Sequence, residues 1–132
     1  MTNNIDPLTV VRGYLDAYTS NDISAAATYL ADDFDFEGPF VHATSAKDFI
    51  GDGTGPGLAA WAKNLTGMHV TAAFAEDNEV IAIYDVHTAP FGTLRTASYF
   101  TVRDGKIQTE KIIFDPTTIH RAKAQTARAT ST

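Results

Sequence analysis

Apolar and polar residues follow two different periods along this chain. Up to about residue 66 the apolar residues recur at helical spacing, and from residue 68 to 115 they alternate with polar residues. The alternating part predicts four consecutive antiparallel strands of roughly ten residues each. A short strand is also expected over "DDFDFEGPF", where the alternation ends at a Gly-Pro pair. Helices followed by a sheet are typical of an α+β fold in which the helices cover one face of a curved sheet.

Capping residues predict where the helices begin. Asp6 caps a first helix over residues 7–20, and Asp22 starts a second one through "ISAAATYL". Ser45 begins a short helical piece, and a third helix over residues 58–66 follows the glycine-rich segment "GDGTGPG". All of these helices precede the four long strands.

Turn sequences predict how the first three long strands pair. A two-residue turn at residues 77–78 sets Thr71 opposite Tyr84. A loop over residues 89–93 then sets Tyr84 opposite Ser98. These three side chains are therefore expected on one face of the sheet.

The last hairpin allows two registers, and they turn Glu110 toward opposite faces. A two-residue turn at residues 104–105 places Glu110 on the outer face. A three-residue loop over residues 103–105 instead sets Ser98 opposite Glu110 and leaves most charged side chains outside. We prefer the second register, in which Glu110 points inward.

In that register the inner face is apolar except for a polar row, with His69 one step away. The row consists of Thr71, Tyr84, Ser98 and Glu110. A carboxylate there loses hydration, which raises its pKa and suits a general acid or base near neutral pH. A solvated Glu110 and a partly exposed, structural His69 are the commoner alternatives. We place the pocket interpretation slightly ahead.

Length and charge limit the classes of function. The chain of 132 residues predicts one domain, residues 1–115, followed by a tail, residues 116–132. The net charge is −6 and the basic residues of the tail, Arg121, Lys123 and Arg128, are typical of a frayed terminus, so no nucleic-acid binding is expected. No apolar run is long enough to span a membrane and no secretory leader is visible, so we expect a cytoplasmic protein.

The chemistry of the side chains predicts a site without metal or organic cofactor. The sequence contains no cysteine, which excludes disulfides, thiolate zinc sites and a cysteine nucleophile. His42 and His87 lack the spacing of metal ligands. Any reaction is therefore expected to depend on carboxyl, imidazole and hydroxyl groups.

Two segments resemble the nuclear transport factor 2-like superfamily. The segment "GYLDAYTSNDISAAATYLADDF" is similar to its paired N-terminal helices, and "FTVRDGKI" followed by "FD" is similar to its last hairpin. Within the superfamily the chain resembles the SnoaL-like polyketide cyclases, ketosteroid isomerases, limonene epoxide hydrolases and scytalone dehydratases over residues 7–115. The resemblance implies a cone-shaped curved antiparallel sheet with N-terminal helices packed on its concave face, a cystatin-like roll. It also implies that Glu110 lies on that face.

The resemblance matches some functional positions of these enzymes and departs from others. Tyr14 matches the oxyanion-binding tyrosine of the isomerases, and His69 resembles a histidine of scytalone dehydratase. Gly38, Ser98 and Ile112 stand where members of the family carry acids. The same fold also hosts binders without activity.

These observations predict a cofactor-free enzyme that transfers protons on a hydrophobic ring compound, as a cyclase, isomerase or dehydratase. The candidate catalytic residues are Glu110, His69 and Tyr14, and the candidate substrate-binding residues are Tyr84, Ser98, Trp61, Phe100 and Ile112. The alternative is a non-catalytic ligand-binding or dimerisation module. An open pocket favours the enzyme, and a core filled by side chains favours the module.

The outer face of the sheet is expected to be more apolar than a monomer usually leaves exposed. Its apolar residues are Val70, Phe74, Ile81, Ile83, Tyr99 and Ile113. Such a face commonly pairs around a two-fold axis. We therefore predict a homodimer through the convex face of the sheet.

Overall fold

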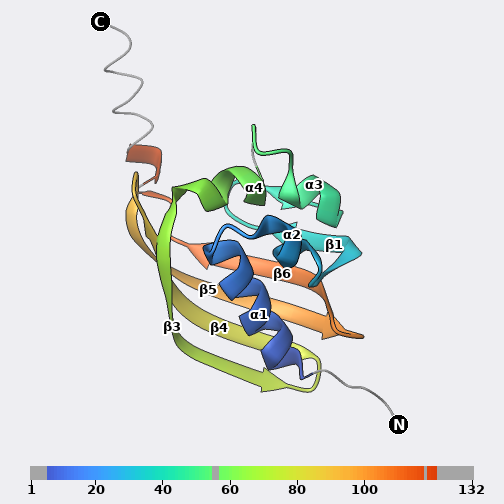
Figure 1. Cartoon of the computed structure of the whole chain (residues 1–132). Helices are drawn as coiled ribbons and strands as arrows, with labels where there is room; N and C mark the ends of the chain where they lie inside the picture. The colour runs from blue at the N-terminus through green and yellow to red at the C-terminus, as the bar shows by residue number, and fades with distance from the viewer. Residues whose placement is uncertain (1–5, 55–56, 118, 122–132) are drawn as a thin grey trace, which may run out of the picture.

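A computed structural model describes residues 6–54, 57–117 and 119–121 of the chain. Figure 1 shows a strongly curved sheet with helices on its concave side. The elements follow in the order α1 (Pro7–Thr19), α2 (Ile23–Ala27), β1 (Leu30–Glu37), β2 (His42–Ala43), α3 (Ala46–Ile50), α4 (Leu58–Trp61), a 3₁₀ turn (Ala62–Asn64), β3 (Leu65–Glu76), β4 (Glu79–Thr88), β5 (Gly92–Arg103) and β6 (Lys106–Phe114). The predicted α+β fold is confirmed.

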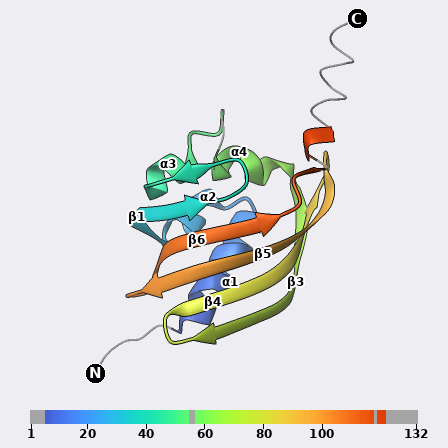
Figure 2. The ribbon, with the colours of Figure 1, turned by 180° about the vertical axis from the view of Figure 1, so that it is seen from behind.

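The six strands form one sheet in the order β2-β1-β6-β5-β4-β3 (Figure 2). The four long strands pair antiparallel, as predicted. The short strand β1 lies parallel to β6, which makes the sheet mixed. Alternation within a strand carries no information about its direction relative to a distant strand, so this pairing was not predictable.

Helix α1 lies across the concave face of the sheet (Figure 1) and contacts all of β3, β4, β5 and β6. Its buried residues are Val10, Val11, Tyr14, Leu15 and Tyr18, which recur at helical spacing and form one stripe. The Asp6 side chain accepts a hydrogen bond from the Leu8 amide and caps the helix, as predicted. The stripe directs both tyrosines toward the sheet.

Two predicted helices are shorter in the structure, because the sheet takes their last residues. Helix α2 ends at Ala27, and Leu30 already pairs with Ile107 of β6. The helix expected over residues 58–66 ends in a 3₁₀ turn, and β3 begins at Leu65. The short helix that begins after Ser45 is confirmed.

A β-bulge in β3 changes the face on which two predicted pocket residues lie. The two-residue turn at residues 77–78 forms as predicted, but the pairing shifts between Val70 and Ala72, so Val70 lies opposite Tyr84 and Thr71 has no partner. One extra residue reverses the alternation of the strand beyond it. Thr71 and His69 are exposed on the outer face, so placing them on the inner face was wrong.

The middle hairpin is offset by two residues from the predicted register. Tyr84 lies opposite Thr96, and Ser98 lies opposite Ala82. A shift of two residues keeps each side chain on its face, because side chains alternate with a period of two. The predicted pairing of Tyr84 with Ser98 is wrong, yet both face inward as expected.

The last hairpin has the two-residue turn at residues 104–105, not the three-residue loop that we preferred. A β-bulge after this turn returns Glu110 to the inner face that we predicted. Asp104 and Gly105 both have positive φ angles, 55° and 75°, and form a two-residue turn. The pairing then shifts at Gln108, which has no partner on β5. Glu110 consequently lies opposite Phe100 instead of Ser98, and it is 2% exposed. Its inward direction is confirmed.

The convex face carries exposed apolar side chains. Phe74 and Ile113 are each 72% exposed, and Ile81 and Ile83 are also exposed. Val70, predicted on this face, instead packs against the core because of the bulge in β3. Among the described residues, no helix is both long and apolar enough to cross a membrane.

Candidate functional site

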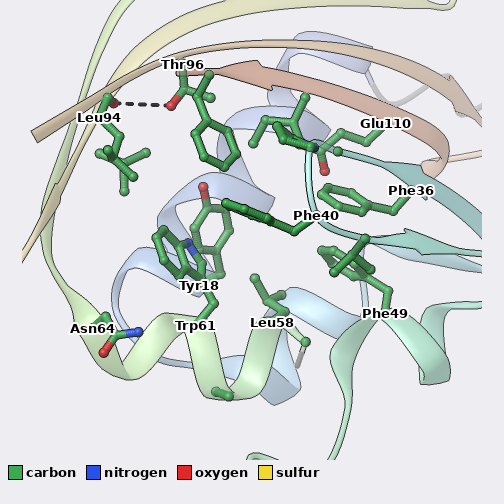
Figure 3. A pocket seen from close by; sticks show the side chains of 18 of the residues that line it. Tyr18, Phe36, Phe40, Phe49, Leu58, Trp61, Asn64, Leu94, Thr96 and Glu110 are labelled. Carbon is green, nitrogen blue, oxygen red and sulfur yellow. Dashed lines mark hydrogen bonds between the residues drawn. The ribbon is translucent and has the colours of Figure 1, made fainter. Parts of the chain in front are cut away.

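A cavity of about 340 Å³ lies between the concave face of the sheet and the helices (Figure 3). Helix α1 contributes Tyr14 and Tyr18, one turn apart, with ring centroids 5.3 Å from each other. Trp61 of α4 stacks on Phe91 at 6.1 Å, with only 10° between the ring planes. Most of the wall is therefore aromatic or aliphatic, which suits an apolar ligand.

The turn between β1 and β2 closes one side of the cavity. Gly38 makes this possible, because a Cβ atom there would lie 2.8 Å from the Cγ2 atom of Ile112. Phe40, from the same turn, is 45% exposed and packs against the rings of Phe114 and His120. Ile119, in the segment predicted as a tail, is buried and lines the cavity.

Glu110 is the one acidic residue among the described residues that line the cavity. Its Oε2 atom accepts a hydrogen bond of 3.0 Å from Ser98, whose Oγ atom lies 2.8 Å from the Tyr84 hydroxyl. Its Oε1 atom is buried and has no hydrogen-bond partner among the described residues. In Figure 3 the carboxyl group of Glu110 lies above the ring of Phe36, at the cavity. A buried carboxyl oxygen without a partner is costly unless a ligand or a proton compensates it.

Burial raises the pKa of Glu110 to about 8, and the hydrogen bond from Ser98 offsets this in part. Among the described residues that line the cavity, none is a lysine, arginine or histidine that could stabilise a negative charge. With a pKa near 8, most Glu110 carboxyl groups carry a proton at pH 7. Glu110 is therefore mainly a neutral hydrogen-bond donor near neutral pH.

The tyrosines of α1 also remain protonated. Burial raises the pKa of Tyr14 and of Tyr18 well above the ordinary value, and for Tyr14 the negative charge of Glu110 adds to the effect. Both phenols are therefore neutral hydroxyl groups at the cavity wall.

The structure brings only some of the candidate residues to the cavity. Glu110, Tyr14, Trp61 and Ile112 line it. Tyr84, Ser98 and Phe100 are buried in the sheet behind it and are not part of the lining. The structure therefore does not place these three at the cavity wall: Phe100 packs its ring against Tyr14 at 6.4 Å, and the hydroxyls of the other two lie 2.8 Å apart.

His69 does not belong to the site. It is exposed on the outer face, opposite Asp85 of β4, on the other side of the sheet from the cavity. The bulge at Thr71 is the physical reason, because it reverses the faces of the residues just before it in β3, from Gly67 to Val70. The expectation that His69 is a second proton-transfer group in the pocket is therefore wrong.

Comparisons with known proteins give the family. The protein-family model that describes the SnoaL-like domain matches residues 11–110 of the sequence. The chain belongs to the SnoaL-like family. The predicted resemblance to the nuclear transport factor 2-like superfamily is thereby confirmed. A search of the curated proteins gave no match.

Solved structures agree with this assignment of the SnoaL-like domain. A protein from Kribbella flavida is 26% identical, with a TM-score of 0.83 over 92% of this chain and 96% of its own. An NTF2-like protein from Cytophaga hutchinsonii is 22% identical, with a TM-score of 0.74 over 91% of this chain and 99% of its own. A candidate ketosteroid isomerase from Kribbella flavida is 16% identical, with a TM-score of 0.66 over 83% and 77%. The last two show the fold alone.

Several lining residues of this SnoaL-like domain were not among the candidates. Tyr18 follows Tyr14 by one helical turn on the buried stripe, and this spacing could have identified it. Phe36, Phe49 and Asn64 reach the cavity only through the packing of β1, α3 and the 3₁₀ turn, which no sequence pattern shows. In residues 6–54, 57–117 and 119–121, no three acidic or histidine side chains cluster as a metal site would.

Proposed function

We propose that the cavity binds an uncharged, hydrophobic ring compound and that Glu110 transfers a proton to and from it, without a cofactor. The observation that carries this proposal is the buried Glu110 carboxyl group, whose Oε1 atom has no partner among the described residues, at the wall of an apolar cavity. Such a group is a suitable general acid near neutral pH. Of the three predicted reaction types, an isomerase-type proton shift needs the fewest groups.

The lining favours a neutral ligand with a polar atom at one end. Aromatic rings from α1, α4 and β1 surround the space, and Glu110 lies on the sheet side. An anionic group would find no cation in the described lining and would increase the cost of ionising Glu110. A carbonyl oxygen, in contrast, accepts the hydrogen bond that Oε1 can donate.

The proton shift balances within the ligand. Glu110 gives its proton to the carbonyl oxygen, and the carboxylate so formed removes a proton from the adjacent carbon, which converts a ketone into its enol. Glu110 returns to its starting state. Tyr14, a neutral phenol in the same wall, is a second hydrogen-bond donor that polarises the carbonyl group.

The test uses 1-acetylnaphthalene, a two-ring ketone with exchangeable methyl protons. We expect binding, detected by fluorescence or calorimetry, and exchange of the methyl protons in D₂O faster than in buffer, followed by NMR. Glu110→Gln keeps a hydrogen-bond donor but cannot shuttle a proton, so it should slow exchange about 10² to 10⁴-fold and keep most of the affinity. Tyr14→Phe should slow exchange by roughly 10²-fold.

Glu76→Gln is the matched control, because Glu76 is exposed at the tip of the β3–β4 hairpin. It makes the same chemical change and should leave binding and exchange as they are. Exchange that is equally fast in Glu110→Gln and in the unaltered protein would contradict the proton transfer.

A second candidate function is ligand binding without turnover in the same cavity. The outward position of His69 favours it, because Glu110 is then the one carboxyl or imidazole group of the described lining. If the protein only binds its ligand, we expect tight binding of 1-acetylnaphthalene and no acceleration of the exchange of its methyl protons. We also expect its affinity to change in Glu110→Ala. The two functions therefore differ in the exchange measurement.

We also propose that two copies of the chain associate through the convex face of the sheet. The exposed side chains of Phe74, Ile81 and Ile113 support this proposal, because contiguous apolar surface usually marks an interface. The cytoplasmic location remains a prediction from the sequence.

A further inference from the structure

Three polar side chains behind the cavity wall form one hydrogen-bonded chain. The Tyr84 hydroxyl lies 2.8 Å from Ser98 Oγ, and the Ser98 hydroxyl donates to Glu110 Oε2 at 3.0 Å. Their exposed fractions are 0%, 2% and 2%. They stand on the neighbouring strands β4, β5 and β6, so the pairing of the sheet holds them in place.

The number of protons links the directions of the two hydrogen bonds. A serine hydroxyl has one proton, so a Ser98 that donates to Glu110 can only accept from Tyr84. Tyr84 is then the donor of the first hydrogen bond and Oε2 the acceptor of the second. In this direction of the chain, the proton of a protonated carboxyl group lies on Oε1, the oxygen without a partner in the described part of the chain.

We infer that Tyr84 and Ser98 are positioning residues that hold Glu110 with Oε2 as acceptor and direct the proton on Oε1 into the cavity. Neither residue lines the cavity, so neither touches the ligand directly. Tyr84 also shares a hydrogen bond with Tyr18, which lines the cavity, so Ser98→Ala is the more specific of the two variants. The positioning itself is a property of the free protein. It rests on the proposed function only in that the proton on Oε1 reaches a ligand.

The opposite direction of the chain would give the cavity a different chemistry. If Glu110 donated to Ser98 and Ser98 to Tyr84, the oxygen at the cavity would be an acceptor. Such a cavity would prefer the donor 1-naphthol to the acceptor 1-acetylnaphthalene. The two directions thus predict opposite ligand preferences at a pH below 8, where Glu110 is protonated.

The first measurement needs no ligand. The carbonyl stretching band of the protonated Glu110 is identified at pH 6 by infrared spectroscopy as the band that Glu110→Gln abolishes. In Ser98→Ala the carbonyl oxygen loses its hydrogen bond, so the band should move to higher wavenumber. The pKa of Glu110 should rise, because the hydrogen bond from Ser98 lowers it in the unaltered protein.

Thr101→Val is the matched control. Thr101 forms a hydroxyl pair with Thr109 at 2.7 Å on the same two strands, and its neighbours in β5, Phe100 and Val102, face the core. The variant removes a cross-strand hydroxyl hydrogen bond without touching Glu110. Its Glu110 band and titration should not change.

Tyr84→Phe keeps the aromatic ring and removes the hydroxyl that pairs with Ser98. It provides a second test of the positioning role if Ser98→Ala does not fold. We expect a shift of the band in the same direction as in Ser98→Ala, but smaller, because Ser98 can still donate. In the exchange assay both variants should lower kcat, Ser98→Ala by roughly tenfold or more, with KM little changed. A residue that only stabilises the fold would not move the band.

The outcomes separate this inference from the proposed function. An unchanged band and titration in Ser98→Ala and Tyr84→Phe would overturn the positioning role even if the ketone binds and exchanges. Tighter binding of 1-naphthol than of 1-acetylnaphthalene at pH 6 would overturn the direction of the donor chain. Shifted bands without binding of 1-acetylnaphthalene would support the positioning role and contradict the proposed function.

Discussion

At the scale of single residues, one buried carboxyl group distinguishes the cavity from an ordinary apolar core. Glu110 is 2% exposed, and its stabilising contacts are one hydrogen bond from Ser98 and the apolar wall around it. Most buried acids in proteins are paired with a cation. Because the described lining supplies no cation, the carboxyl group of Glu110 keeps its proton and is mainly neutral at neutral pH.

The raised pKa of Glu110 predicts that the stability of the protein depends on pH, and that Glu110→Gln removes this dependence. The unfolded chain loses the Glu110 proton near the ordinary pKa of 4.5, whereas the native protein keeps it up to about 8. Between these values the native state binds more protons than the unfolded state. The free energy of unfolding should therefore fall as pH rises, by about 1.4 kcal/mol per pH unit from this group.

Urea denaturation from pH 5 to 9 measures the effect. Glu110→Gln should have a flatter profile and become the more stable protein above pH 8, while Glu76→Gln should follow the unaltered protein. Parallel profiles for all three would show that Glu110 ionises as freely in the native state as in the unfolded chain.

At the scale of elements, the sequence predicted which segments become strands better than how they pair. Alternation and turn residues identified the four long strands, and Asp104-Gly105 has the residues of a two-residue turn. Neither signal reports a β-bulge, because an extra residue is placed by the packing of the whole sheet. The bulge at Thr71 moved His69 out of the predicted site, and the one at Gln108 kept Glu110 inside.

The turn between β1 and β2 gives a prediction at the same scale. A Cβ atom at Gly38 would lie 2.8 Å from Ile112 and 3.1 Å from the ring of Phe36, and both line the cavity. Gly38→Ala should therefore destabilise the fold by about 1 to 3 kcal/mol through overpacking. It should also weaken the binding of 1-acetylnaphthalene, because the side chains that give way move into the cavity or away from it.

Gly67→Ala is the matched control, because the nearest atom to its Cβ would be His87 Cδ2 at an ordinary 3.6 Å. It should change stability by less than about 0.5 kcal/mol. Urea denaturation and ligand titration on the two variants check the prediction. Equal stability and affinity in both would mean that the turn does not need its close approach to β6.

At the scale of the whole molecule, the two faces of the sheet differ in what covers them. The concave face and the helices enclose the cavity, and the convex face leaves Phe74 and Ile113 each 72% exposed. The sequence predicted this division, because it follows from side-chain alternation along the stretches of strand that lie outside the bulges. It could not predict the wall made by Phe36, Phe49 and Ile119, which depends on how segments distant in the sequence meet.

The division predicts that association can be abolished without affecting the site. We expect a dimer at micromolar concentration in sedimentation experiments, because an apolar sheet face of this kind gains free energy when a second copy covers it. Ile113→Glu places a charge on that surface and should weaken association at least tenfold, since leaving a charge unpaired in an interface costs more than about 1.4 kcal/mol. Lys111→Glu, an exposed change on the same strand and face, should weaken it less.

The infrared band of Glu110 should be the same in both variants, because Ile113 and Lys111 point away from the cavity. A monomer in the unaltered protein would contradict association through this face, and a shifted Glu110 band in Ile113→Glu would contradict the independence of the two faces.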